Sequence, residues 1–320
     1  MSFKRILSFV VTVSLLLLPI VAILQRQNLY DWWVLRSYVP PAEIAQLAAD
    51  TTMTEQGKRI FYVTKPEIKS VQDFRGECTS AEQTIVLGCY KTGSGIFLYE
   101  VTDPRLAGIK QVTAAHEMLH AAYDRLSSKE KETINSLTEQ AYANVVDERL
   151  RKNVEAYRTR DESVVPNELH SILGSEVEVL PAQLEEHYKK YFNDRQKIVQ
   201  YSKQYEKEFS ERQAKVEAYD MQLKRLKSEI DTLKSDLDNL EADINSQKSI
   251  MDALYAEKKY EEYNKLVSPY NAKIAGFNVK ANVLRQKIAE HNTIVEQRNA
   301  LVVEEQELYK AIDTRVPSAR

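Results

Sequence analysis

The chain has 320 residues, 28% of them charged, and a formal net charge of −3 at pH 7. This near balance excludes the strongly basic class of nucleic-acid-binding proteins, so no nucleic-acid partner is predicted. A content of 43% apolar and aromatic residues, with only 8 glycines and 9 prolines, excludes a disordered chain and favours a folded, helix-rich protein.

The N-terminal segment combines two basic residues with a long apolar run. Lys4 and Arg5 precede residues 6–25, which carry no charge and are nearly all apolar. A helix of about 20 such residues crosses the hydrocarbon core of a bilayer, and the aromatic residues of LYDWW follow where an interfacial belt would lie. We predict an uncleaved signal anchor with a cytoplasmic N-terminus and the rest of the chain outside the cytoplasm. The alternatives are a cleaved signal peptide and a buried helix of a soluble protein.

Three β-rich segments and a pair of cysteines follow the predicted anchor. Residues 59–68, 84–90 and 95–101 are rich in β-branched and aromatic residues, and we predict that each forms a strand. The turn residues KTGSG between the last two segments indicate a hairpin. Cys78 and Cys89 could close a small loop as a disulfide, which would form in an oxidising compartment.

The helix predicted after this hairpin carries the pattern HEMLH at residues 116–120. His116 and His120 are four residues apart, so a helix projects both imidazoles from one face, where together they can hold one metal ion. Glu117 lies about 100° around the helix axis and can reach a water molecule beside that metal. These are the residue types of a catalytic zinc site, two ligands and a general base, so the pattern predicts zinc-dependent hydrolysis.

A third protein ligand is expected on a later helix, because catalytic zinc takes three protein ligands and keeps one position open. Asn167 and Glu168 begin the segment NELHS. The HEMLH pattern followed by N-E-x-x-S resembles the gluzincin class of zinc metallopeptidases, the thermolysin-like group, over two short motifs. The resemblance implies that Glu168 is the third ligand. On the residues alone, His170 and Glu176 stay as alternatives.

The sequence departs from the gluzincin pattern at the residue that orients a ligand histidine. The class has an aspartate after the serine, where this chain has Ile172, so another side chain must take that role, and Glu176 and Asp124 are the candidates. The two motifs are also further apart than in the thermolysin-like group, which an inserted helix over 128–158 would explain. Several gluzincins bind the oxyanion of a hydrated carbonyl with a histidine, and the resemblance makes His170 the candidate here. Weaker candidates for the same role are Tyr123 and Tyr157.

The chain is predicted to be helical from this point almost to its end. Helices are expected over 128–158, 164–176 and 181–192. Ser127 and Glu130 have the spacing of a capping box, in which each side chain binds the backbone N–H of the other residue. This box is expected to begin the first of the three helices.

Apolar residues recur in steps of three and four from residue 196 to residue 314, which is the heptad seam of a coiled coil. The seam is interrupted at Ser268 and Pro269, so we predict an antiparallel hairpin that turns there and that could bind a partner protein or a second copy. The alternative is one long intermolecular coiled coil kinked at Pro269. Of the other histidines, His291 is expected on the seam and His187 on an exposed helix surface.

These features together predict an α+β, predominantly helical protein of three parts. We expect an N-terminal anchor and juxtamembrane segment over 1–37, a small zincin-like metallopeptidase domain over 38–195 and a coiled-coil hairpin over 196–314. The predicted function is that of a single-pass membrane protein that hydrolyses peptide bonds of a protein or peptide substrate outside the cytoplasm, with Zn²⁺ as cofactor and Glu117 as base. The alternatives are a non-catalytic cell-envelope scaffold with a metal- or peptide-binding domain, and an amidase acting on cell-wall peptides.

Overall fold

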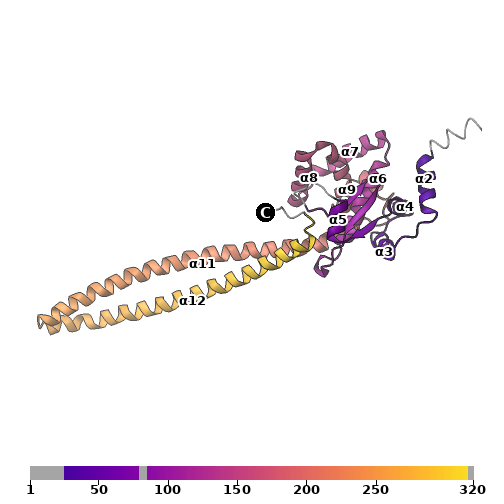
Figure 1. Cartoon of the computed structure of the whole chain (residues 1–320). Helices are drawn as coiled ribbons and strands as arrows, with labels where there is room; N and C mark the ends of the chain where they lie inside the picture. The colour runs from indigo at the N-terminus through magenta and orange to yellow at the C-terminus, as the bar shows by residue number, and fades with distance from the viewer. Residues whose placement is uncertain (1–24, 79–84, 316–320) are drawn as a thin grey trace, which may run out of the picture. The chain divides into compact units, whose positions relative to one another are not determined.

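The computed structural model describes residues 25–78 and 85–315 of the chain (Figure 1). The chain divides into two compact units: one holds the residues up to Glu208 together with those from Lys310 on, and the other is Phe209–Tyr309. Helices make up most of both units, which confirms the prediction of a predominantly helical protein.

Helix α6 lies at the centre of the first unit. The helices of this unit are α2 (Arg26–Leu35), α3 (Ala42–Asp50), α4 (Glu55–Val63), α5 (Val71–Glu77), α6 (Ile109–Asp124), α7 (Ser128–Tyr142), α8 (Glu148–Arg160), α9 (Val165–Glu176) and α10 (Ala182–Tyr188). Figure 1 shows α6 beside α9, and α6 also packs against α3 and α4. The apolar face of α6, which includes Ala115, Leu119 and Ala122, is buried in the core.

The first unit also contains a three-stranded sheet with the strand order β1-β3-β2. Its strands are β1 (Glu67–Lys69), β2 (Gly88–Lys91) and β3 (Gly95–Tyr99). β2 and β3 pair antiparallel, which confirms the predicted hairpin, whereas β1 pairs parallel with β3. A disulfide between Cys78 and Cys89 joins the end of α5 to β2 and confirms the predicted cysteine pair.

The predicted strand over 59–68 is wrong in its first part, which belongs to helix α4. Thr54 caps this helix by accepting a hydrogen bond from the Gly57 N–H at 3.1 Å. Ile60 and Phe61 follow Gly57 at steps of three and four, and this face is buried. Because α4 packs this face against its neighbours, helical periodicity outweighs the β-propensity of the aromatic and β-branched side chains.

The predicted helix over 128–158 consists of two helices, α7 and α8. The capping box of Ser127 and Glu130 begins α7 as predicted. A second cap follows at Asp147, whose carboxylate accepts hydrogen bonds from the backbone N–H groups two and three residues further along the chain. This second cap starts a new helix, so the chain changes direction between the two. The helices predicted over 164–176 and 181–192 correspond to α9 and α10.

The second unit is an antiparallel helical hairpin, as predicted. Helix α11 (Gln196–Ala256) and helix α12 (Tyr260–Ile312) lie side by side (Figure 1), and the residue numbers of their ion pairs rise along one helix as they fall along the other. These pairs are Arg212–Glu304, Asp220–Arg298, Glu229–Lys287, Asp236–Lys280 and Asp243–Lys273. The alternative prediction, one long coiled coil kinked at Pro269, is wrong for this chain because the two helices pair with each other.

The turn of the hairpin lies at residues 257–259, so its predicted position at Ser268 and Pro269 is wrong. Lys258 has a left-handed φ of 59°, and the Lys259 N–H binds the Leu254 carbonyl at 2.9 Å, an arrangement that ends α11. Pro269 lies inside α12 instead. The helix continues through this position although proline supplies no N–H.

The hairpin unit begins at Phe209, later than the predicted residue 196. The first turns of α11 belong to the first unit because Ile198 is part of its hydrophobic core. The chain returns to this unit after α12, where the Thr314 hydroxyl donates a hydrogen bond to the Val86 carbonyl at 2.6 Å. The residues directly before Phe209 and directly after Tyr309 therefore both belong to the first unit.

The prediction of a single-pass membrane protein is contradicted. Among residues 25–78 and 85–315, no helix is both long enough and apolar enough to cross a bilayer. The long helices α11 and α12 carry charged side chains throughout, which a hydrocarbon core disfavours. The predicted spanning segment 6–25 lies outside the described residues except for its last residue. The predicted extracytoplasmic location depended on a membrane-spanning segment, so it is withdrawn together with the prediction of a single-pass membrane protein.

Candidate metal centre

The two histidines of the HEMLH segment project from one face of α6, as their spacing predicts. The centroids of the two rings are 4.7 Å apart, and the Nε2 atoms of His116 and His120 are 3.1 Å apart. Their side chains are 18% and 12% exposed, so both are held by the protein and still reach solvent. The pair can bind one ion that water can also approach.

Helix α9 brings Glu168 to the same point. Oε2 of Glu168 lies 3.8 Å from Nε2 of His116 and 3.8 Å from Nε2 of His120. One ligand atom from each residue lies within 4.8 Å of the others, so the three could hold a metal ion. The packing of α9 against α6 therefore gathers the three predicted ligands, although Glu168 is distant from the histidines in sequence.

Contacts at the Nδ1 atoms favour one tautomer of each ring. Nδ1 of His120 is 2.9 Å from Oδ1 of Asn167, an oxygen that can only accept, so Nδ1 carries the proton. Ser175 Oγ donates to a backbone carbonyl at 2.7 Å and is 3.5 Å from Nδ1 of His116, so it accepts a long hydrogen bond from that nitrogen. A neutral imidazole protonated at Nδ1 has its lone pair at Nε2. Two lone pairs therefore face each other at 3.1 Å.

The three residues fit a cation of the size of zinc. Zinc binds imidazole nitrogen and carboxylate oxygen at about 2.0–2.2 Å in a tetrahedron, which places its ligand atoms about 3.3–3.5 Å apart. The observed separations of 3.1, 3.8 and 3.8 Å bracket this range. A cation there would also separate the two facing lone pairs. Two imidazoles and one carboxylate are one of the donor sets that catalytic zinc uses.

The Glu168 carboxylate has the properties of a ligand. Its Oε2 atom is buried and has no hydrogen-bond partner among the described residues. Burial alone would raise the pKa of Glu168, but a hydrogen bond from His116 and the positive charges of His120 and His116, when these rings are protonated, outweigh burial and lower the pKa. A cation beside Glu168 would likewise favour the ionised carboxylate, whose Oε2 atom is available to bind it.

Glu117 lies between helix α6 and the edge strand β2. The residue is 5% exposed. A Cβ atom on Gly88 of β2 would lie 2.8 Å from Oε1 of Glu117, so the missing side chain at Gly88 leaves the room that this carboxylate occupies. The predicted general base is thus held against β2, a strand at one edge of the described sheet.

The side chains that orient the ligand histidines are Asn167 and Ser175, which the sequence analysis did not identify. The predicted candidates have other partners. Glu176 forms an ion pair with Arg149 at 2.8 Å, and Asp124 accepts a hydrogen bond from a threonine in the turn between β2 and β3 at 2.8 Å. One feature of the sequence points to Asn167: it lies directly before Glu168. The helix turn that brings Glu168 to the two histidines therefore brings Asn167 close to them as well.

His170, the predicted oxyanion binder and alternative ligand, is not part of the ligand group. The residue is completely buried, with its Nε2 atom 2.9 Å from Nε2 of His187 and the rings of Tyr123 and Tyr188 packed around it. His187 is 6% exposed, so its predicted place on an exposed surface is wrong. Burial lowers the pKa of both histidines, that of His187 to about 4. Tyr157 packs against the core, half-buried.

Comparisons with protein-family models, with curated proteins and with solved structures found no match to this chain. The resemblance to gluzincins thus rests on the two short motifs, and the argument for a metal centre rests on the geometry of its residues.

Proposed function

We propose that the protein is a zinc-dependent hydrolase of peptide bonds, with a zincin-like site on helices α6 and α9. The observation that carries this proposal is the convergence of His116, His120 and Glu168 on one point, with ligand atoms 3.1 to 3.8 Å apart. Purely structural histidines are commonly satisfied by hydrogen bonds. Here a cation would satisfy the unpartnered Glu168 oxygen and separate the two facing lone pairs.

Each residue of the site has a role in this reaction. Zinc, when bound, lowers the pKa of water towards about 7 and polarises a carbonyl group. His116, His120 and Glu168 would hold the ion. Glu117 takes a proton from the attacking water and delivers it to the leaving amine nitrogen, which completes hydrolysis of the amide. Asn167 keeps the proton of His120 at Nδ1 and so keeps its Nε2 atom available.

The edge strand favours an extended peptide as the substrate. β2 forms one edge of the sheet, and its first residue, Gly88, lies against Glu117. An extended chain that pairs with a sheet edge presents its backbone carbonyls in regular order along that edge. A peptide on β2 would therefore pass beside the general base.

The test is metal content and hydrolysis measured on the full chain purified without a chelating resin. We expect one zinc per chain by elemental analysis, lost in Glu168→Ala and retained in Glu162→Ala, a matched change at an exposed residue near α9. Glu117→Gln should retain zinc and lose hydrolysis of an unfolded protein such as casein. A folded parent chain that binds no zinc would refute the proposal.

The hairpin of α11 and α12 supports a second candidate, a coiled-coil scaffold whose metal group has no catalytic role. Long antiparallel helices with charged outer faces are typical of proteins that bind partners. The same variants separate the two functions. If the parent chain binds zinc but hydrolyses casein no faster than Glu117→Gln does, the result favours the scaffold.

A further inference from the structure

We propose that Arg149 is a positioning residue for the metal ligand His116, acting through Ser175, and that it links the metal group to the first turns of α11. This inference rests on the proposed metal centre. It adds a residue from α8, a helix that supplies no ligand.

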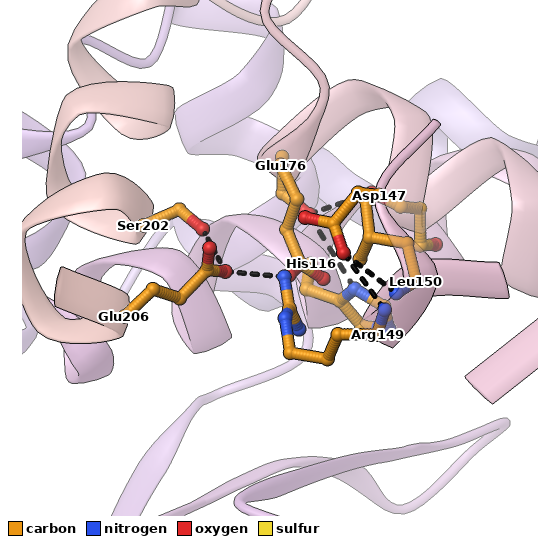
Figure 2. Close-up of polar contacts among 9 residues, drawn as sticks. His116, Asp147, Arg149, Leu150, Glu176, Ser202 and Glu206 are labelled. Carbon is orange, nitrogen blue, oxygen red and sulfur yellow. Dashed lines mark hydrogen bonds and ion pairs between the residues drawn. The ribbon is translucent and has the colours of Figure 1, made fainter. Parts of the chain in front are cut away.

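Arg149 bridges two carboxylates from different helices. Its Nη2 atom lies 2.8 Å from Oε2 of Glu176, the last residue of α9, and the same guanidinium pairs with Glu206 of α11. Figure 2 shows Arg149 joined to Glu206, which also accepts a hydrogen bond from Ser202 at 2.8 Å. The bridge therefore joins α8, α9 and α11 at one place, within the first unit of the chain.

The bridge is partly shielded from water. The side chains of Glu176, Glu206 and Arg149 are 11%, 24% and 41% exposed. Burial by itself would lower the pKa of Arg149, but the two carboxylates outweigh it and raise the pKa above its ordinary value. Since screening by solvent is weaker here than at an exposed ion pair, loss of the arginine leaves two carboxylates close together and unpaired.

Glu176 is adjacent in sequence to the residue that contacts His116. Ser175 is completely buried, donates to the Ser171 carbonyl at 2.7 Å and lies 3.5 Å from Nδ1 of His116. Helix α9 ends at Glu176, and the next residue, Val177, is extended. Ser175 thus lies in a terminal helical turn, the part of a helix that frays first unless side chains hold it.

Arg149 holds this last turn through a side chain, while a second arginine holds it through the backbone. Arg195, which directly precedes α11, donates to the carbonyls of Val177 and Glu178 at 2.6 and 2.9 Å. With Arg195 in place, loss of Arg149 is expected to loosen the turn without unfolding it. Ser175 would then hold Nδ1 of His116 less firmly, and the ring would lose orientation.

The expected consequence is weaker metal binding. Residues that orient a ligand histidine typically contribute about 10–100-fold to metal affinity, and Arg149 acts one residue further out, so we expect a loss of about 10-fold. The ligand field should change as well, because the angle of one imidazole changes.

The experiment uses the full chain with Zn²⁺ and with Co²⁺, whose absorption spectrum reports ligand geometry. Arg149→Met should weaken Zn²⁺ binding about 10-fold in competition with a chromogenic chelator and alter the Co²⁺ spectrum. Arg149→Lys, which keeps the charge, should recover part of the affinity. The matched control is Arg158→Met on the same helix, because Arg158 pairs with Glu139 of α7 at 2.8 Å. This substitution should leave the Zn²⁺ affinity and the Co²⁺ spectrum unchanged.

A double-mutant cycle separates positioning from general destabilisation. If Arg149 acts through Ser175, the double variant Arg149→Met/Ser175→Ala should bind Zn²⁺ no more weakly than Ser175→Ala alone. Additive losses would overturn the inference, as would an Arg149→Met chain with unchanged affinity and spectrum, and both would leave the metal centre intact. A parent chain that binds neither ion overturns the proposed function and this inference with it. If Arg149→Met does not fold, Glu176→Gln weakens the contact through which Arg149 holds the last turn of α9 and should show the same losses.

Discussion

Replacing Gly88 with alanine should displace Glu117 while leaving the metal ligands in place. The new Cβ would lie 2.8 Å from both Cγ and Oε1 of Glu117 and 2.6 Å from Cγ2 of Thr113. Thr113 cannot turn away easily, because its hydroxyl donates to the Ile109 carbonyl at 2.8 Å and β-branched side chains are stiff at χ1. Relief of these contacts therefore needs a small shift of β2 away from Thr113 together with movement of the Glu117 side chain, which is the more flexible of the two.

The size of the effect follows from these distances. An ordinary contact begins at 3.4 Å, so Oε1 of Glu117 must retreat from 2.8 Å by about 0.6 Å or more. Overpacking of this kind costs about 1–3 kcal/mol of stability. A displacement of 1 Å in a catalytic group can cost about 100-fold in rate, so we expect hydrolysis to fall by roughly 10- to 100-fold.

The assay compares Gly88→Ala with Gly76→Ala in hydrolysis of casein, zinc content and urea unfolding. Gly76 lies in helix α5, and a Cβ there meets nothing within 4 Å, so alanine should be neutral or stabilise by up to about 1 kcal/mol. Zinc content should equal that of the parent in both variants. If Gly88→Ala hydrolyses casein as fast as Gly76→Ala, the placement of Glu117 against β2 has no catalytic meaning.

Three further predictions concern the ligand support, the buried histidines and the hairpin. Asn167→Ala should weaken Zn²⁺ binding by about 10–100-fold in a chelator competition, whereas Asn167→Asp should retain it; equal affinity in both would contradict the protonation assigned to the ligand ring. The pKa of His187 lies at about 4, so the unfolded chain binds a proton that the folded chain excludes. Stability should therefore fall by up to about 3 kcal/mol as the pH drops from about 6.5 to about 4, and urea unfolding of His187→Gln should depend less on pH. Pro269→Ala should stabilise the hairpin by up to about 3 kcal/mol and so raise its melting temperature, because alanine restores a backbone donor inside α12. A lower melting temperature would argue against the placement of Pro269 inside the helix.

The parts of the site that local spacing defines could be predicted, and the parts that depend on contacts between distant segments could not. His116 and His120 share a face because four residues make about one turn of any α-helix. Asn167 was missed as the partner of His120 because they meet only when α9 packs against α6. His187 was placed on the surface for the same reason, since its burial depends on contact with His170.

The sequence by itself determined the helical nature of the chain, the heptad pattern of the two long helices and the β2–β3 hairpin, because each follows from short-range periodicity or turn chemistry. The cysteine pair followed from the presence of only two cysteines in the sequence. Only the tertiary structure decided that residues 55–63 are a helix, that the hairpin turns at Lys258 and that the first turns of α11 belong to the first unit. Segments with two compatible local conformations adopt the one that buries more apolar surface, and that choice depends on neighbours that lie far away in sequence.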